Sequence, residues 1–147
     1  MPDDFLKYEF FDHTADVMFV ARGRTLADAF ANAAYAMTDT ITEHSLIRPV
    51  SSGRAAVEAE DEKALLYDFL EYFIILVDSE GFLLSKIDHI EIFQDYKSGT
   101  HKAIFEYSGD RDISSYEIKK AVKAVTYQQM NISHSDGICS VRVVLDI

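Results

Sequence analysis

The sequence predicts an α+β fold in which two main helices pack on an antiparallel or mixed sheet. Two long segments, residues 25–41 and 62–79, carry apolar residues at helical spacing. Other segments alternate apolar and polar residues, as half-buried strands do, and Asp136-Gly137 is typical of a tight hairpin turn. A chain of 147 residues can bury a full core or two small halves that share one. We expect a single domain over residues 1–147.

The first third of the chain is expected to form two strands and a helix. Residues 5–11 are rich in aromatic side chains that alternate with charged ones, and residues 17–21 are continuously apolar, so both favour strands. Residues 22–24 are expected to form a turn. Thr25, followed three residues later by Asp28, resembles a capping box that begins a helix. The apolar face of this helix consists of Leu26, Ala29, Phe30, Ala33, Met37 and Ile41.

The second helix has clear signals at both ends. Asp61 is a favourable N-cap, and Gly81 is well placed to end the helix. A strand over residues 54–60, alternating apolar and charged residues, precedes it. Its wide apolar stripe indicates a helix that lies across a core, and consists of Leu65, Leu66, Phe69, Leu70, Phe73, Ile74 and Val77.

The second half of the chain is predicted to be mainly β-structure. The expected elements are a short strand at 82–84, a hairpin of strands 87–93 and 101–107, a loop at 108–112, a short helix at 113–120, and strands at 122–132 and 138–145. In the last strand Cys139 shares one face with Val141, Val143 and Leu145, which favours a core position. It is the only cysteine, so an internal disulfide is impossible.

The charge and hydropathy of the chain exclude several classes of partner. The net charge is −11, from 25 acidic and 14 basic residues. This argues against direct nucleic-acid binding and against docking on an anionic membrane. An acidic surface favours basic partners, although it can also serve solubility alone.

No apolar run is long enough to cross a bilayer, and residues 1–4 lack the features of a signal peptide. A cytoplasmic location is therefore expected.

Residues 11–17, Phe-Asp-His-Thr-Ala-Asp-Val, form a dense group of polar side chains between two apolar runs. Asp12, His13, Thr14 and Asp16 place two carboxylates, an imidazole and a hydroxyl within five residues. Such oxygen ligands suit a hard divalent cation. The alternative is an ordinary polar turn, because Asp and Thr are common turn residues.

The end of the chain offers two further carboxylates. The Asp146 side chain and the Ile147 main-chain carboxylate directly follow a strong predicted strand. If this strand lies near Asp12 and Asp16, three or four negative groups converge. Such a cluster is unfavourable without a cation, which is a physical reason to expect one. An all-oxygen ligand set favours Ca²⁺, Mg²⁺ or Mn²⁺ over Zn²⁺.

Several segments, in order along almost the whole chain, resemble the archease family. They are Asp12-His13-Thr14-Ala15-Asp16, Thr25-Leu26 with Ala29-Phe30 and Ala33, Leu65-Leu66 with Phe69-Leu70, Val122-Lys123-Ala124-Val125-Thr126-Tyr127, and Asp146-Ile147. The resemblance implies one compact archease-like domain built from two strand-helix-strand-strand units. It also implies a non-enzymatic accessory role for an RtcB-type GTP-dependent RNA ligase in tRNA splicing. Archeases promote guanylylation of the ligase and allow multiple turnovers.

The resemblance also assigns site residues. The family's metal site corresponds to Asp16, Asp146 and the Ile147 carboxylate, with Asp12 ranked second. Lys123 matches a family lysine linked to activity and could contact phosphate or the ligase. His13 belongs to the motif without a clear role. The chain departs from the family pattern at Gln128, where histidine is usual, and has no histidine near Tyr116.

Two other functions fit the same residues. One is a metal-dependent phosphoester hydrolase in which Asp12 and Asp16 hold the metal and His13 is the base, although no phosphate-binding loop or activated nucleophile is evident. The other is an acidic, chaperone-like adaptor in which a metal merely holds the C-terminus against the first loop.

Overall fold

The computed structural model describes residues 5–147, and the expectation about a signal peptide at residues 1–4 lies outside them. The described chain contains helices α1 (Leu26–Ile41) and α2 (Glu62–Glu80), and short 3₁₀ turns η1 (His44–Leu46) and η2 (Ile113–Ser115). Its strands are β1 (Tyr8–Phe11), β2 (Val17–Gly23), β3 (Ser51–Ala59), β4 (Leu83–Gln94), β5 (His101–Asp110), β6 (Ala124–Ser135) and β7 (Ile138–Asp146). Neither helix is long and apolar enough for a bilayer crossing.

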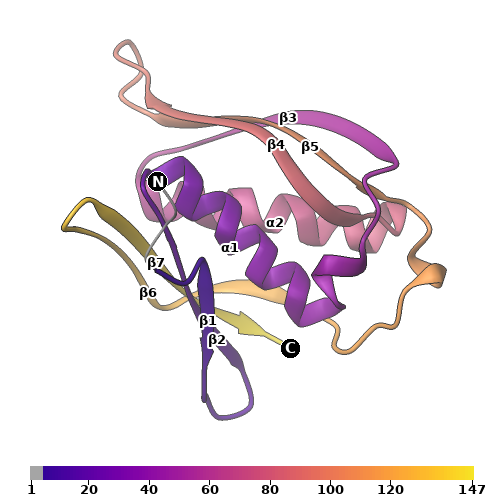
Figure 1. Cartoon of the computed structure of the whole chain (residues 1–147). Coiled ribbons are helices and arrows are strands. Elements are labelled where there is room, and N and C mark those ends of the chain that lie inside the picture. The colour runs from indigo at the N-terminus through magenta and orange to yellow at the C-terminus, as the bar shows by residue number, and fades with distance from the viewer. Residues whose placement is uncertain (1–4) are drawn as a thin grey trace.

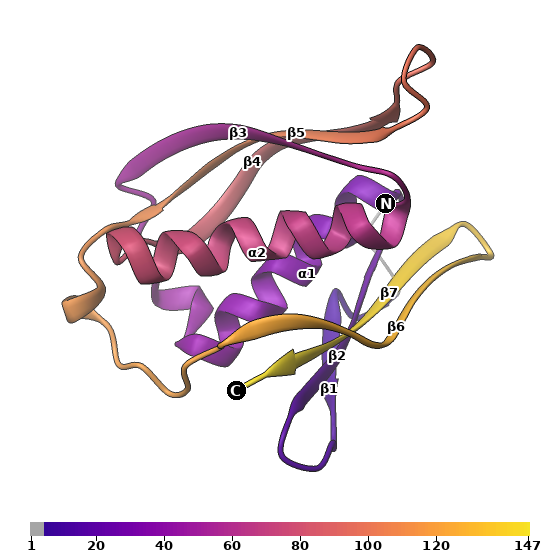
Figure 2. The same ribbon diagram turned by 180° about the vertical axis from the view of Figure 1, so that it is seen from behind.

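The strands form two sheets, and the helices lie between them (Figures 1 and 2). The strand orders are β1-β2-β7-β6 and β3-β5-β4. Every strand pair is antiparallel, so the α+β prediction is confirmed with antiparallel rather than mixed sheets. The segments β2-α1-β6-β7 and β3-α2-β4-β5 share one strand order, first-last-middle. These are the two expected strand-helix-strand-strand units, with the second inserted between α1 and β6 of the first.

A layer of helices between two sheets must be apolar on more than one face. In α1 this requirement is met by small residues, since Ala29, Ala33, Ala34 and Ala36 are all fully buried. In α2 it is met by aromatic side chains. The Phe69 ring centroid lies 5.5 Å from that of Phe30 on α1 and 4.9 Å from that of Phe105 on β5. This aromatic cluster therefore connects both helices to the three-stranded sheet.

The predicted helix ends are confirmed. The Thr25 side chain accepts a hydrogen bond from the Asp28 amide at 3.1 Å, and Asp61 accepts one from the Ala64 amide at 2.8 Å. Gly81 ends α2 with a left-handed φ of 61°, a conformation that favours glycine. The predicted buried face of the last strand is also confirmed, because Cys139, Val141, Val143 and Leu145 are at most 2% exposed.

The prediction of a helix over residues 113–120 is wrong. Only η2 forms, and the chain then runs extended along the end of α1. The Lys119 amide donates to the Ile41 carbonyl at 2.7 Å, and the Thr42 hydroxyl donates to the Glu117 carbonyl at 2.7 Å. Hydrogen bonds to a distant segment thus replace those of a local helix.

Several strand limits also differ from the prediction. The two strands predicted at 82–84 and 87–93 form one continuous strand, β4, which begins at Leu83. The pairing of β4 with β5 contains two register shifts. The expected loop at 108–112 is largely strand, because β5 pairs through Gly109 with Ser51 and through Asp110 with Leu83. Residues 22 and 23, both expected in a turn, are the last two residues of β2. The beginnings of β1, β3 and β6 and the end of β6 also differ from the prediction, each by two or three residues.

Candidate functional site

The pairing of β2 with β7 brings the first loop beside the end of the chain. Val17 is the partner of Leu145, so Asp16 and Asp146 flank the same end of the ladder. On the other side of β7, Ala124 is the partner of Asp146, and the Lys123 amide donates to the Asp146 carbonyl at 2.8 Å. The structure thus brings together Asp16, Asp146 and Lys123, which are far apart in the sequence. Asp16 is half-buried, whereas Asp146 and Lys123 are exposed.

His13 lies between Asp16 and the β6 strand. Its Nδ1 is 3.4 Å from Asp16 Oδ2, and its Nε2 is 3.3 Å from Gln129 Nε2. Nδ1 is buried, and within residues 5–147 it makes no hydrogen bond. When the Gln129 amide donates to Nε2, the proton of a neutral imidazole is on Nδ1 and faces Asp16. His13 thus lies beside the Asp16 carboxylate without a hydrogen bond to it. Ala15, with a left-handed φ of 62°, closes the loop.

Asp12 does not complete a three-carboxylate site with Asp16 and Asp146. In the described part of the chain, no three His, Cys, Asp or Glu side chains are grouped closely enough to hold a metal ion. The set of Asp16, Asp146 and the Ile147 main-chain carboxylate contains only two such side chains, and it stays a prediction. Its chemistry fits a hard cation, because all of its donors are carboxylate oxygens placed at one end of one ladder.

A cavity of about 430 Å³ opens beside this loop. Asp12, His13 and Asp16 line it from one side. Lys119 and Lys120 line it too, and neither ammonium group forms an ion pair with another of the residues described. The extended segment that contains Lys119 and Lys120, which was predicted to be helical, therefore brings positive charge toward the candidate site.

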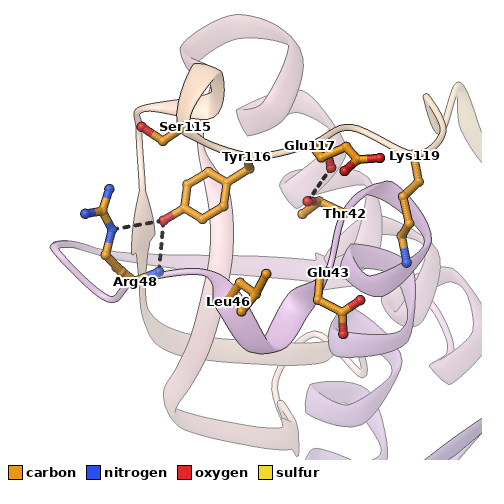
Figure 3. Close-up of a pocket in the computed structure, with 8 residues that line it drawn as sticks. All are labelled: Thr42, Glu43, Leu46, Arg48, Ser115, Tyr116, Glu117 and Lys119. Carbon is orange, nitrogen blue, oxygen red and sulfur yellow. Dashed lines mark hydrogen bonds between the residues drawn. The ribbon is translucent and has the colours of Figure 1, made fainter.

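A second cavity, of about 700 Å³, shares Lys119 with the first (Figure 3). At its end, the Tyr116 hydroxyl accepts from the Arg48 amide at 3.0 Å and donates to Asp110 Oδ2 at 2.7 Å. Arg48 Nη2 lies 3.3 Å from the same carboxylate oxygen. The Tyr116 hydrogen bond is the main reason that the pKa of Asp110 is lowered. These contacts secure the chain between β5 and Lys119, so we assign this network a structural role.

Sequence reasoning missed the residues that join the site from outside the motif. Gln129 contacts His13 from 116 positions away, and nothing in its local sequence indicates this. The Lys119-Lys120 pair is visible in the sequence, but the prediction of a helix there gave no reason to place it near Asp16.

A comparison with known proteins identifies the family of this chain. Residues 8–147 match the model of the Archease protein family. The chain belongs to the archease family. Protein archease of Methanothermobacter thermautotrophicus is 36% identical over 140 residues, which cover 95% of this chain and 98% of the relative. Protein archease of Aeropyrum pernix is 38% identical over 138 residues, covering 92% and 94% of the two chains.

Two solved structures share the fold. The solution structure of Methanobacterium thermoautotrophicum protein 1598 has a TM-score of 0.79 at 33% identity, covering 96% of this chain and 99% of that one. A crystal structure of a Thermotoga maritima archease, described as a possible chaperone, has a TM-score of 0.58 at 15% identity, covering 93% and 94%. At that identity the second likeness supports the fold alone. Family and fold are thus as the sequence motifs predicted.

Proposed function

We propose that this chain is a non-catalytic activator of an RtcB-type RNA ligase in tRNA splicing. It would promote guanylylation of the ligase and multiple turnover through a carboxylate-bound divalent metal. The observation that carries the proposal is the pairing of Val17 with Leu145, which places Asp16 and the last two residues at one end of a ladder. Membership of the archease family supports the choice of this function.

Asp16, Asp146 and the Ile147 carboxylate would hold the metal, with Asp12 as a candidate ligand of second rank. A bound Mg²⁺ or Mn²⁺ would neutralise charge that develops on phosphate, and Ca²⁺ suits the same ligands. His13 would be the neighbour of this ligand set, with its Nδ1 3.4 Å from Asp16 Oδ2. Lys123, exposed and anchored beside Asp146 through its amide, would contact phosphate or the ligase.

The charge of the chain fits a ligase as partner. An enzyme that binds RNA carries a basic surface, and a protein of net charge −11 is attracted to such a surface. Association should therefore be fast and should weaken as salt is added. The same negative charge opposes direct binding of RNA by this chain.

The test is a guanylylation assay with limiting RtcB-type ligase and excess RNA ends. The variants are Asp16→Asn, Asp146→Asn and a chain extended by a few residues beyond Ile147. Asp136→Asn is the matched control, because it removes one negative charge at the exposed β6–β7 turn. Circular dichroism would establish that each variant is folded, and calorimetric titration with Mn²⁺ would report the metal directly.

We expect the wild type and Asp136→Asn to stimulate guanylylation and to bind Mn²⁺. The other three proteins should lose both the stimulation and the Mn²⁺ binding. Stimulation that survives in Asp16→Asn and Asp146→Asn would refute a working metal site and favour the adaptor function. Absence of stimulation by the wild type would refute the activator function itself.

The placement of His13 keeps one enzymatic alternative open. His13 lines the 430 Å³ cavity together with Asp12 and Asp16, as a general base beside a metal would. Steady turnover of a phosphoester by the isolated protein, abolished by His13→Gln, would favour the hydrolase over the activator.

A further inference from the structure

The β6 strand contains a long, irregular bulge at the edge of its sheet. Thr126 pairs with Val144 and Asn131 pairs with Arg142, so four residues of β6 lie opposite one residue of β7. Gln129 in this bulge has a left-handed φ of 52°, and its carbonyl accepts a hydrogen bond from Arg142 Nε at 2.8 Å. Bulges of this kind redirect side chains and are frequent near functional sites. No strand covers this side of β6 in the described chain.

The bulge directs Tyr127 onto Tyr67 of α2. The two rings are stacked, with centroids 4.6 Å apart and planes 11° apart. Figure 2 shows β6 running alongside α2, which allows this contact. Tyr67 is packed against the core, whereas Tyr127 is 55% exposed. The pair is therefore a fixed aromatic surface, held on one side and open on the other.

Several carboxylates act electrostatically on the two rings. Burial and the negative charges of Asp68, Asp61 and Glu60 raise the pKa of Tyr127. Burial together with Glu71 and Asp68 raises the pKa of Tyr67. The open ring of Tyr127 thus lies in a negative field contributed by the first turns of α2 and the residues before it.

We propose that the Tyr67–Tyr127 pair is a docking site for an arginine side chain in a basic segment of a partner protein. A guanidinium group stacks on aromatic rings and pairs with carboxylates at the same time, which matches both features of this surface. A nucleotide base could also stack on Tyr127, but its phosphates would then be repelled by the carboxylates around it. The partner class rests on the proposed function, because an RNA-binding protein carries such basic segments.

The test measures the binding of a fluorescein-labelled peptide of alternating glycine and arginine to the full chain by fluorescence anisotropy at low salt. Tyr67→Ala and Tyr127→Ala should each weaken binding about two- to fivefold, as expected for loss of an exposed cation–π contact. Tyr96→Ala is the matched control, since Tyr96 is fully exposed on the distal β4–β5 hairpin. All three changes leave the net charge unaltered, so general attraction to a basic peptide persists in each.

Equal affinity of Tyr127→Ala and Tyr96→Ala would overturn the proposal. Tyr127→Phe should bind as the wild type does, because the aromatic face is retained; binding as weak as that of Tyr127→Ala would also overturn it. The double variant Asp68→Asn/Tyr127→Phe should bind the peptide more weakly than Tyr127→Phe alone. The peptide assay contains no ligase, so its failure is distinguishable from failure of ligase activation.

Discussion

Truncation of Phe69 to alanine should destabilise the protein more than most single substitutions. Phe69 is fully buried, and its ring contacts Phe30, Phe73 and Phe105, with centroids 4.9–5.5 Å away. Phe→Ala changes in protein cores cost about 3–5 kcal/mol, and aromatic pairs add roughly 0.5–1.5 kcal/mol each to simple burial. We therefore expect a loss near the upper end of that range, a large part of a typical stability of about 5–15 kcal/mol.

The measurement is urea denaturation followed by far-ultraviolet circular dichroism and by tyrosine fluorescence, because the chain has no tryptophan. Ile75→Ala is the control on the same helix, since Ile75 is 53% exposed, and it should change stability by about 0.5 kcal/mol or less. Phe69 contacts Phe105 of the three-stranded sheet and Phe30 of α1, so the sheet and the helix should unfold together. Circular dichroism and tyrosine fluorescence should therefore report one coincident transition. A loss below about 1.5 kcal/mol, or separate transitions, would refute a shared core centred on this cluster.

Four further outcomes follow from single contacts. Asp61→Ala removes the acceptor of a first-turn amide of α2 and should cost about 1 kcal/mol in urea denaturation. Gly81→Ala places a side chain at a left-handed φ of 61° and should cost about 1–2 kcal/mol in the same measurement. Cys139 is buried, which raises the pKa of its thiol to about 11, so iodoacetamide at neutral pH should modify it only after unfolding. Tyr116→Phe removes the hydrogen bond that chiefly lowers the pKa of Asp110, so an NMR titration should find that pKa higher. Because a lowered carboxyl pKa stabilises the folded state above the unfolded value of about 4, the stability difference between Tyr116→Phe and wild type should shrink as the pH falls below it.

The helices could be predicted from sequence because the signals that limit them are local. The Thr25 and Asp61 side chains bond amides three residues away, and Gly81 needs only its own backbone freedom to end α2. The error at residues 113–120 has the opposite origin. The Lys119 amide bonds the Ile41 carbonyl, 78 positions earlier, and no local pattern contains that information.

The site divides in the same way. The motif around Asp16 and the two carboxylates at the chain end could be recognised as candidate ligands, but their proximity depends on pairing Val17 with Leu145 across most of the chain. The contact of Gln129 with His13 could not be predicted at all. It depends on a bulge whose extra residues become visible only in the register of β6 against β7.

That bulge links the two surfaces on which the proposals rest. Tyr127 at its beginning contacts α2, and Gln129, two residues later, contacts His13. His13 in turn lies 3.4 Å from Asp16. A basic segment bound at Tyr127 would therefore press on a short, strained piece of backbone that also positions the side chain next to the candidate metal ligand. Because the bulge is at a sheet edge, a partner docked at Tyr127 would act on the backbone that carries Gln129 and, through Gln129, on the His13 side chain beside Asp16.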